Sequence, residues 1–122
     1  DYIFTPIAAD RVVLESSLSF AVAIHKLLVK NEACRLKGLH LFWNMVDGRE
    51  KTDLYTLYEQ TIGELELPLM KVFIPDTKRF KKELDAQRKT VFRSTLFPAD
   101  KRLVKGSNME ELITEIAYLI KL

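Results

Sequence analysis

Two positions at the ends of apolar runs carry the residues best suited to chemistry in this sequence. Asn44 follows a run that ends at Trp43, and Pro75 and Asp76 follow a run that ends at Ile74. If both runs are parallel strands, these residues meet at the sheet edge where open α/β folds bind ligands. An asparagine amide offers one acceptor and two donors, and a proline ring can lie against a base. The pattern suits a purine site; the simpler interpretation is a turn asparagine and a strand-ending proline.

The hydrophobic periodicity of the chain predicts the elements that position these residues. Apolar residues three and four apart indicate helices, and short apolar runs closed by proline or turn residues indicate strands. The order of strand, helix and strand at this spacing is typical of right-handed parallel crossovers. We expect one α/β domain over residues 1–122, with three parallel strands and helices on both faces. The predicted strands are 2–7, 39–43 and 69–74, and the predicted helices are 11–30, 52–65, 78–89 and 109–122.

Capping residues mark the predicted starts of several helices. Asp10 precedes the first helix, Thr52 stands at the start of the second, and Ser107 with Glu110 fits a capping box before the last. Residues 90–105 show no clear period, which predicts an extended crossing over the sheet end. The two histidines, His25 and His40, and Trp43 lie in apolar surroundings, and packing is the expected role of all three.

The composition is that of an ordered globular domain. Of the 122 residues 48% are hydrophobic, with only 4 Gly and 4 Pro. The apolar stretch 18–29 is interrupted by polar residues and is too short to cross a bilayer, and no signal-like segment stands at the start, so we expect a cytoplasmic protein without membrane contact. The single cysteine, Cys34, predicts a structural thiol, and no His/Cys cluster has metal-ligand spacing.

The positive charge is concentrated in the second half of the chain. Residues 71–105 contain eleven Lys/Arg and four Asp/Glu, although the net charge of the whole chain is only +2. Such a segment can form a patch for the nucleic-acid backbone, and a solvated helix face is the equally weighted alternative. No helix-turn-helix or zinc motif indicates base-specific binding. The candidate DNA-binding residues are Lys78, Arg79, Lys81, Lys82, Arg88, Lys89, Arg93, Lys101, Arg102 and Lys105.

Three segments in order resemble one known family. Pro6 to Glu15 is similar to the proline-then-Leu-Glu signature after the fifth strand of ParA-type partition ATPases, the deviant Walker-A relatives of MinD. Asn44 to Arg49 is similar to the Met-x-Asp-x-Arg turn of that family, and Ile74 to Phe80 resembles its Ile-Pro segment. The resemblance covers about residues 1–85 and is greatest to the ParA-like proteins of conjugative elements.

The resemblance implies a partial P-loop NTPase-like sheet that binds a nucleotide base. It implies adenine recognition for Asn44, Pro75 and the backbone that follows at Asp76. It also implies a dimer, nonspecific DNA binding, a partition partner protein, and the use of ATP and Mg by the complete protein. Two departures from the family are Ala8, where Gln is frequent, and Asp76-Thr77, where Arg-Asn or Arg-Ser is common. The residues that the resemblance places near the nucleotide-dependent dimer face are Pro6, Asp10 and Glu15.

The phosphate-binding loop of the family has no counterpart in this sequence. No Gly-x-x-x-x-Gly-Lys-Ser/Thr motif occurs, and the 4 glycines are scattered. We therefore expect that this chain alone binds no cofactor and does not hydrolyse ATP, and that the phosphate half of such an ATPase precedes Asp1. The strand at 2–7 would then be an unpaired edge, which favours self-association. The alternative function is a catalytically silent interaction or nonspecific DNA-binding module with a degenerate nucleotide site.

Overall fold

Two parallel strands lie at the centre of the fold. Strand β1 (Tyr2–Ile7) pairs with β2 (Gly38–Trp43), with Tyr2 opposite Gly38 and Ile7 opposite Trp43. The structure is a computed structural model that describes residues 1–29, 31–49, 52–77 and 101–121. The remaining described elements are α1 (Arg11–Ile24), the π-helix η1 (His25–Val29), α2 (Thr52–Glu64), α4 (Lys101–Gly106) and α5 (Met109–Leu119).

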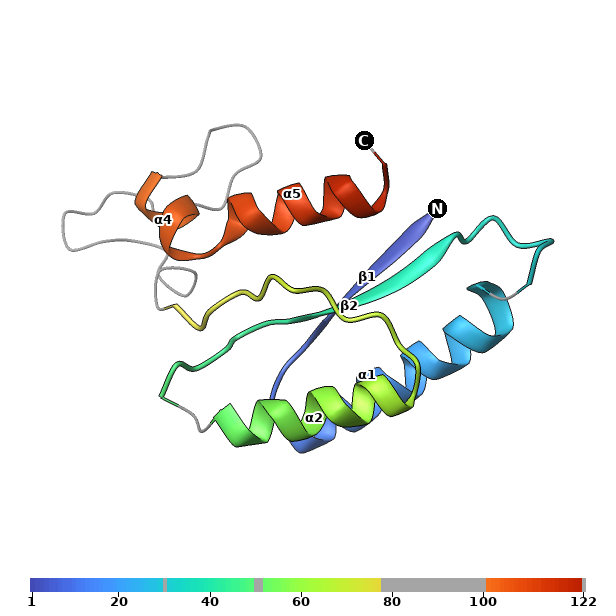
Figure 1. The fold of residues 1–122 in the computed structure, drawn as a ribbon, viewed down its shortest axis with the longest axis horizontal. Coiled ribbons are helices and arrows are strands. Elements are labelled where there is room, and N and C mark those ends of the chain that lie inside the picture. The colour runs from blue at the N-terminus through green and yellow to red at the C-terminus, as the bar shows by residue number, and fades with distance from the viewer. Residues whose placement is uncertain (30, 50–51, 78–100, 122) are drawn as a thin grey trace.

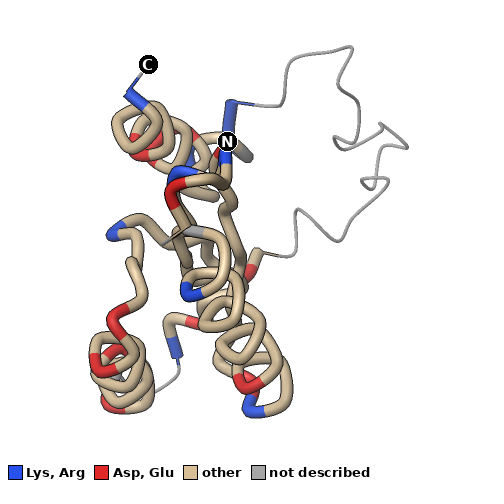
Figure 2. The backbone as a smooth tube through the Cα atoms, turned by 90° about the vertical axis from the view of Figure 1, so that its right-hand side faces the viewer, with Lys and Arg blue, Asp and Glu red and all other residues tan. Residues whose placement is uncertain are grey.

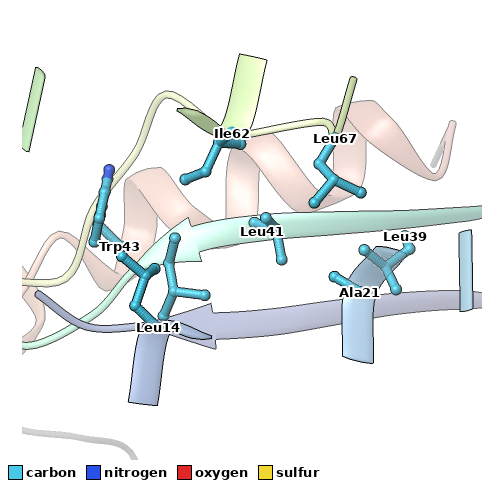
Figure 3. Packing of buried hydrophobic residues seen from close by; sticks show 8 residues of the cluster. Leu14, Ala21, Leu39, Leu41, Trp43, Ile62 and Leu67 are labelled. Carbon is cyan, nitrogen blue, oxygen red and sulfur yellow. The ribbon is translucent and has the colours of Figure 1, made fainter. Parts of the chain in front are cut away.

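Helices cover both faces of this sheet, as predicted (Figure 1). On the face of α1 and α2, alternate residues of β2 enter one core, which Figure 3 shows in part. On the opposite face, Leu112 of α5 packs with Met70 and Ile74. The two cores follow from the period-two alternation of side chains along a strand. The buried residues of the larger core are Ile7, Leu14, Ala21, Leu39, Leu41, Trp43, Ile62 and Leu67.

The predicted third strand is wrong, and with it the three-stranded P-loop-like sheet. The described residues form a two-stranded sheet of order β1-β2. Residues 68–76, yellow in Figure 1, do run parallel to β2, but only two isolated bridges join them, Leu41 to Leu69 and Val46 to Pro75. The α/β class stands, since parallel strands and helices are present, but the sheet is smaller than predicted.

A bulge in residues 71–73 interrupts this third ladder. The Leu41 carbonyl accepts a hydrogen bond from Met70 N at 2.8 Å, and the next strand carbonyl, that of Trp43, accepts from Ile74 N at 2.8 Å. In a regular parallel ladder the second donor would be Val72. Two extra residues are therefore inserted opposite β2, and their backbone groups need other partners.

Side chains of α5 and of Asn108, which directly precedes it, supply those partners. The Glu115 carboxylate accepts from Lys71 N and Val72 N, each at 2.8 Å, one N–H to each oxygen. The Asn108 amide donates from Nδ2 to the Phe73 carbonyl at 2.9 Å. These bonds take the place of strand pairing, and this explains why an apolar run that suits a strand is held beside β2 without being one.

The N-terminal half agrees closely with the sequence prediction. Helix α1 begins at Arg11, and Asp10 Oδ1 accepts from Val13 N at 3.0 Å, so the predicted cap is confirmed. The helix widens into η1 from His25 to Val29 and does not stay α-helical through the predicted 30; residue 30 lies outside the described ranges. Helix α2 begins at Thr52 and ends at Glu64, one residue before the predicted end.

The C-terminal region differs from the prediction. The expected capping box of Ser107 and Glu110 is wrong, because Asn108 precedes α5 with φ 57° and Ser107 is buried, with its hydroxyl donating to Val104 O at 3.4 Å. Residues 101–106 form α4 where an extended crossing was predicted, and α5 ends at Leu119. Because α4 ends directly before α5, the turn between them is tight, and asparagine tolerates the left-handed conformation there. The predicted helix 78–89 lies outside the described residues.

Replacing Glu115 tests the role of its carboxylate. We expect Glu115→Ala to lower the free energy of unfolding by about 2 kcal/mol and Glu115→Gln by about 1 kcal/mol, because an amide keeps one acceptor while a carboxylate has two. Urea denaturation measures both values. The amides of residues 71 and 72 should also exchange faster. Glu111→Ala, an exposed site on the same helix, is the control and should change stability little; equal losses at both sites would contradict this role.

His40 makes stability depend on pH. Its ring stacks on Phe4 at 5.5 Å and on Tyr2 at 6.5 Å. Burial lowers the His40 pKa below its ordinary 6.5, and the nearby Glu115 charge opposes this only in part. The unfolded chain then binds the proton more readily, so the contribution of neutral His40 to the free energy of unfolding is fully present above about pH 7 and is lost as the pH falls below the ordinary histidine pKa of about 6.5.

A comparison with His40→Gln isolates this effect from the titration of carboxylates. The difference in unfolding free energy between the native chain and the variant should be constant above about pH 7 and shift against the native chain as the pH falls below it. A difference that stays constant from pH 7 to about pH 5 would show that His40 titrates normally.

Candidate functional site

A single residue in the left-handed conformation reorganises the backbone where β2 ends. Met45 has φ 52°. Residues Asn44 and Met45, although consecutive, line one pocket, and Trp43 and Val46 both line another. In a regular strand consecutive side chains point to opposite faces, so the left-handed residue changes the alternation. The strand end thereby presents two separate surfaces.

The predicted base-binding residues come together in the first of these pockets. Asn44, Pro75 and Asp76 line a cavity of about 390 Å³, on the side of the sheet that α5 covers. Asn44 is half-buried, and its side-chain amide forms no hydrogen bond with any other described residue. These three residues therefore lie together, as expected for the carboxyl ends of neighbouring parallel strands, although the predicted third strand is irregular. The other lining residues are Met45, Ile74, Thr77 and Met109.

Backbone hydrogen bonds fix both sides of the pocket. Asn44 N donates to Ile7 O at 2.7 Å, which ties the pocket to the end of β1. On the other side, Asp76 N donates to Val46 O at 2.9 Å, and Ile74 O accepts from Val46 N at 3.1 Å. The Asp76 N–H is thus engaged in the backbone pairing that fixes this side of the pocket.

An ion pair closes the turn after Met45. The Arg49 guanidinium donates to both Asp47 oxygens at 3.2 Å, and Arg49 N donates to Asp47 Oδ1 at 2.9 Å. These bonds hold the pKa of Asp47 below its ordinary value, and the same contact raises the pKa of Arg49, with the Asp76 charge adding to the effect. The side chains of the predicted Asp-x-Arg turn therefore bond each other, but the Arg49 side chain is 92% exposed, so the ion pair adds little stability.

The residues predicted for the dimer face do not line the pocket. Pro6 is exposed in β1, Asp10 is occupied as the cap of α1, and Glu15 forms an exposed ion pair with Arg11 at 3.1 Å. None of the three shares the cavity with Asn44. A role for them at a dimer face stays a prediction.

Most of the predicted DNA-binding residues lie outside the described residues. Lys101, Arg102 and Lys105 are exposed on α4. Figure 2 shows the charged positions along the described backbone. The seven that cannot be placed are Lys78, Arg79, Lys81, Lys82, Arg88, Lys89 and Arg93.

Sequence reasoning missed several residues that shape the site. The left-handed conformation of Met45 could not be predicted from the sequence, because methionine has no special preference for that conformation. Met109 lies 34 positions after Pro75 and reaches the pocket only through the packing of α5. The role of Glu115, whose carboxylate bonds the backbone of the bulge, could not be predicted either, since a glutamate on a helix normally lies in solvent. Long-range contacts of this kind leave no local pattern in a single sequence.

The described residues show neither a metal site nor a membrane span. No group of three or more His, Cys, Asp or Glu in the described ranges could hold a metal ion. No helix among those residues is long and apolar enough to cross a bilayer. Cys34 is half-buried, and its Sγ accepts from Leu36 N at 3.5 Å.

Comparison of the chain with family models, with curated proteins and with solved structures finds no match in any of the three. The resemblance to the ParA-type family therefore stays a prediction from the three sequence segments.

Substitutions of Met45 test the left-handed turn that forms the pocket. Met45→Val should lower the free energy of unfolding by about 1 to 2 kcal/mol, because a β-branched side chain is strained at positive φ. Met45→Gly should be tolerated, since glycine adopts this conformation freely and the Met45 side chain is 51% exposed. Thermal or urea denaturation measures both. Equal effects of Val and Gly would contradict the assigned backbone conformation.

Proposed function

We propose that the pocket between Asn44 and Pro75 binds the adenine base of a nucleotide. The chain would form the base-side part of a ParA-like ATPase that maintains a plasmid or conjugative element, with ATP and Mg used by the complete protein. One observation carries the proposal: residues chosen from the sequence for base binding line one cavity, and among them Asn44 has an unpaired amide within the described part of the chain.

The dimensions and chemistry of the pocket suit a base. Its volume of about 390 Å³ lies in the lower part of the roughly 300–1,000 Å³ range of small-molecule sites. The Asn44 amide can accept from the adenine N6 amino group and donate to N7, the pairing that asparagine makes with adenine elsewhere. Guanine offers two acceptors at the same edge, and the amide can satisfy only one of them. The half-buried Pro75 and the apolar Ile74 and Met109 offer surfaces for the flat ring.

A nonspecific DNA-binding module with a degenerate nucleotide site is the second candidate. The exposed cations of α4, namely Lys101, Arg102 and Lys105, favour it. Charge alone is a weaker argument than a cavity with an unpaired amide, because solvated basic helices are common. Nucleotide binding separates the two candidates, since only the first requires the Asn44 pocket.

Titration with AMP and GMP tests the proposal. The sequence predicts no bound ATP and Mg in this chain alone because the phosphate loop is missing, but the base pocket does not use that loop. We therefore expect saturable AMP binding in two-dimensional amide NMR, with shifts of the Asn44 side-chain amide and of residues 74–77, and about tenfold weaker binding of GMP. Asn44→Ala should weaken AMP binding at least about fivefold, because a bidentate base contact is lost. Asn31→Ala, at an exposed asparagine that does not line the pocket, is the matched control and should bind AMP normally.

The same preparation tests the expected lack of hydrolysis. With ATP and Mg present, no phosphate release is expected, because the chain contains no glycine-rich phosphate loop. Magnesium-dependent turnover would contradict this prediction and leave base binding intact. Absence of AMP binding in a folded sample, together with salt-sensitive DNA binding, would reject the base site in favour of the DNA-binding module.

A further inference from the structure

A second cavity lies at the end of β2, on the face of the sheet that α1 and α2 cover. It has a volume of about 240 Å³, and it combines three aromatic residues with two carboxylates: Trp43, Tyr55, Phe73, Asp47 and Glu59. The side chains come from three separate segments, namely the strand end and its turn, helix α2, and the bulge at 71–73. The base pocket proposed above shares none of these residues.

Two of the aromatic rings, those of Trp43 and Tyr55, stand almost at right angles and form a corner. The Trp43 and Tyr55 ring centroids are 4.9 Å apart, and their planes meet at 81°. Trp43 is only 4% exposed, so its ring is held firmly, whereas Phe73 is 43% exposed and belongs to neither hydrophobic core. Aromatic faces carry negative potential, and rings set at right angles can contact a cation from two directions. An exposed phenylalanine beside such a corner has no evident packing role.

The charged side chains that line the cavity favour a ligand with a single positive charge. Asp47 is neutralised by Arg49, whose two guanidinium contacts measure 3.2 Å. Glu59 Oε1 accepts a hydrogen bond at 3.0 Å from the Trp43 indole nitrogen, which is a neutral donor, and Glu59 has no cationic partner among the residues described. No Lys or Arg lines the cavity. The site therefore retains one negative charge beside aromatic rings.

We propose that this cavity binds a methylated ammonium group. A methylated ammonium keeps its charge but is weakly hydrated, so aromatic walls can replace its water, whereas a bare ammonium is strongly hydrated. The volume of about 240 Å³ is below that of typical drug-sized pockets, so it suits a head group or the tip of a side chain. Two sources share this chemistry: a free quaternary amine and a methylated lysine of another protein.

The fluorescence of Trp43, the single tryptophan of the chain, reports directly on the cavity. Tetramethylammonium and choline should each give a saturable change, and 3,3-dimethylbutan-1-ol, the neutral analogue of choline, should bind at least about tenfold more weakly. A peptide with trimethyl-lysine, compared with its unmodified form, tests the second source. Tighter binding of the methylated peptide than of choline assigns the site to a protein ligand, and the reverse assigns it to a free amine.

Two pairs of variants locate the binding. Phe73→Leu and Glu59→Gln should each weaken choline binding several-fold; the first keeps an apolar side chain, and the second keeps an acceptor for the indole. Phe20→Leu on α1 and Glu64→Gln on α2 are matched exposed controls and should bind choline normally. Circular dichroism confirms that each variant is folded. The proposal is overturned if the neutral analogue binds as tightly as choline, if the controls weaken binding equally, or if neither cation nor peptide gives a saturable change.

Discussion

One carboxylate, that of Glu115, accepts hydrogen bonds from two backbone N–H groups and so holds residues 71–73 beside β2. Glu115 of α5 accepts from Val72 N, which would bond β2 in a regular ladder, and from the neighbouring Lys71 N. Charge-assisted bonds of this kind are among the stronger ones in proteins. Without them the bulge would leave amides unpaired, and Phe73 and the segment through Pro75 would lose the support that sets their positions beside β2.

Insertions of different length act differently on a strand. The two extra residues at 71–73 preserve the alternation of faces, so Met70, Val72 and Ile74 all pack towards α5. The single left-handed residue Met45 reverses the alternation instead, and Trp43 and Val46 come to the same side. Together the two irregularities open one cavity on each face of the sheet. The two pockets described above thus lie where the regular pattern fails.

This distinction also explains which features were predictable from the sequence. β1, β2, the cap at Asp10 and the starts of α1 and α2 depend on neighbours within a few residues, and the prediction placed them correctly. Asn44, Pro75 and Asp76 line one pocket, as expected for residues at neighbouring strand ends, while their role in base binding stays a prediction. The bulge was missed because an even insertion leaves the apolar alternation intact. The partners Asn108 and Glu115 lie 35 to 44 residues from the backbone groups that they bind, so no local signal marks them.

Pro6 has a consequence for how this sheet can grow. Asp1 O and Ile7 O accept bonds from Lys37 N and Asn44 N, so the odd-numbered residues of β1 turn their polar groups towards β2. By alternation the even-numbered residues face away, and Pro6 is among them. It has no N–H to donate, so a strand arriving at the outer edge of β1 would find backbone donors only at Tyr2 and Phe4. Any added strand would therefore be held less firmly at its end beside Pro6, where only the carbonyl can bond it, than at its end near Tyr2.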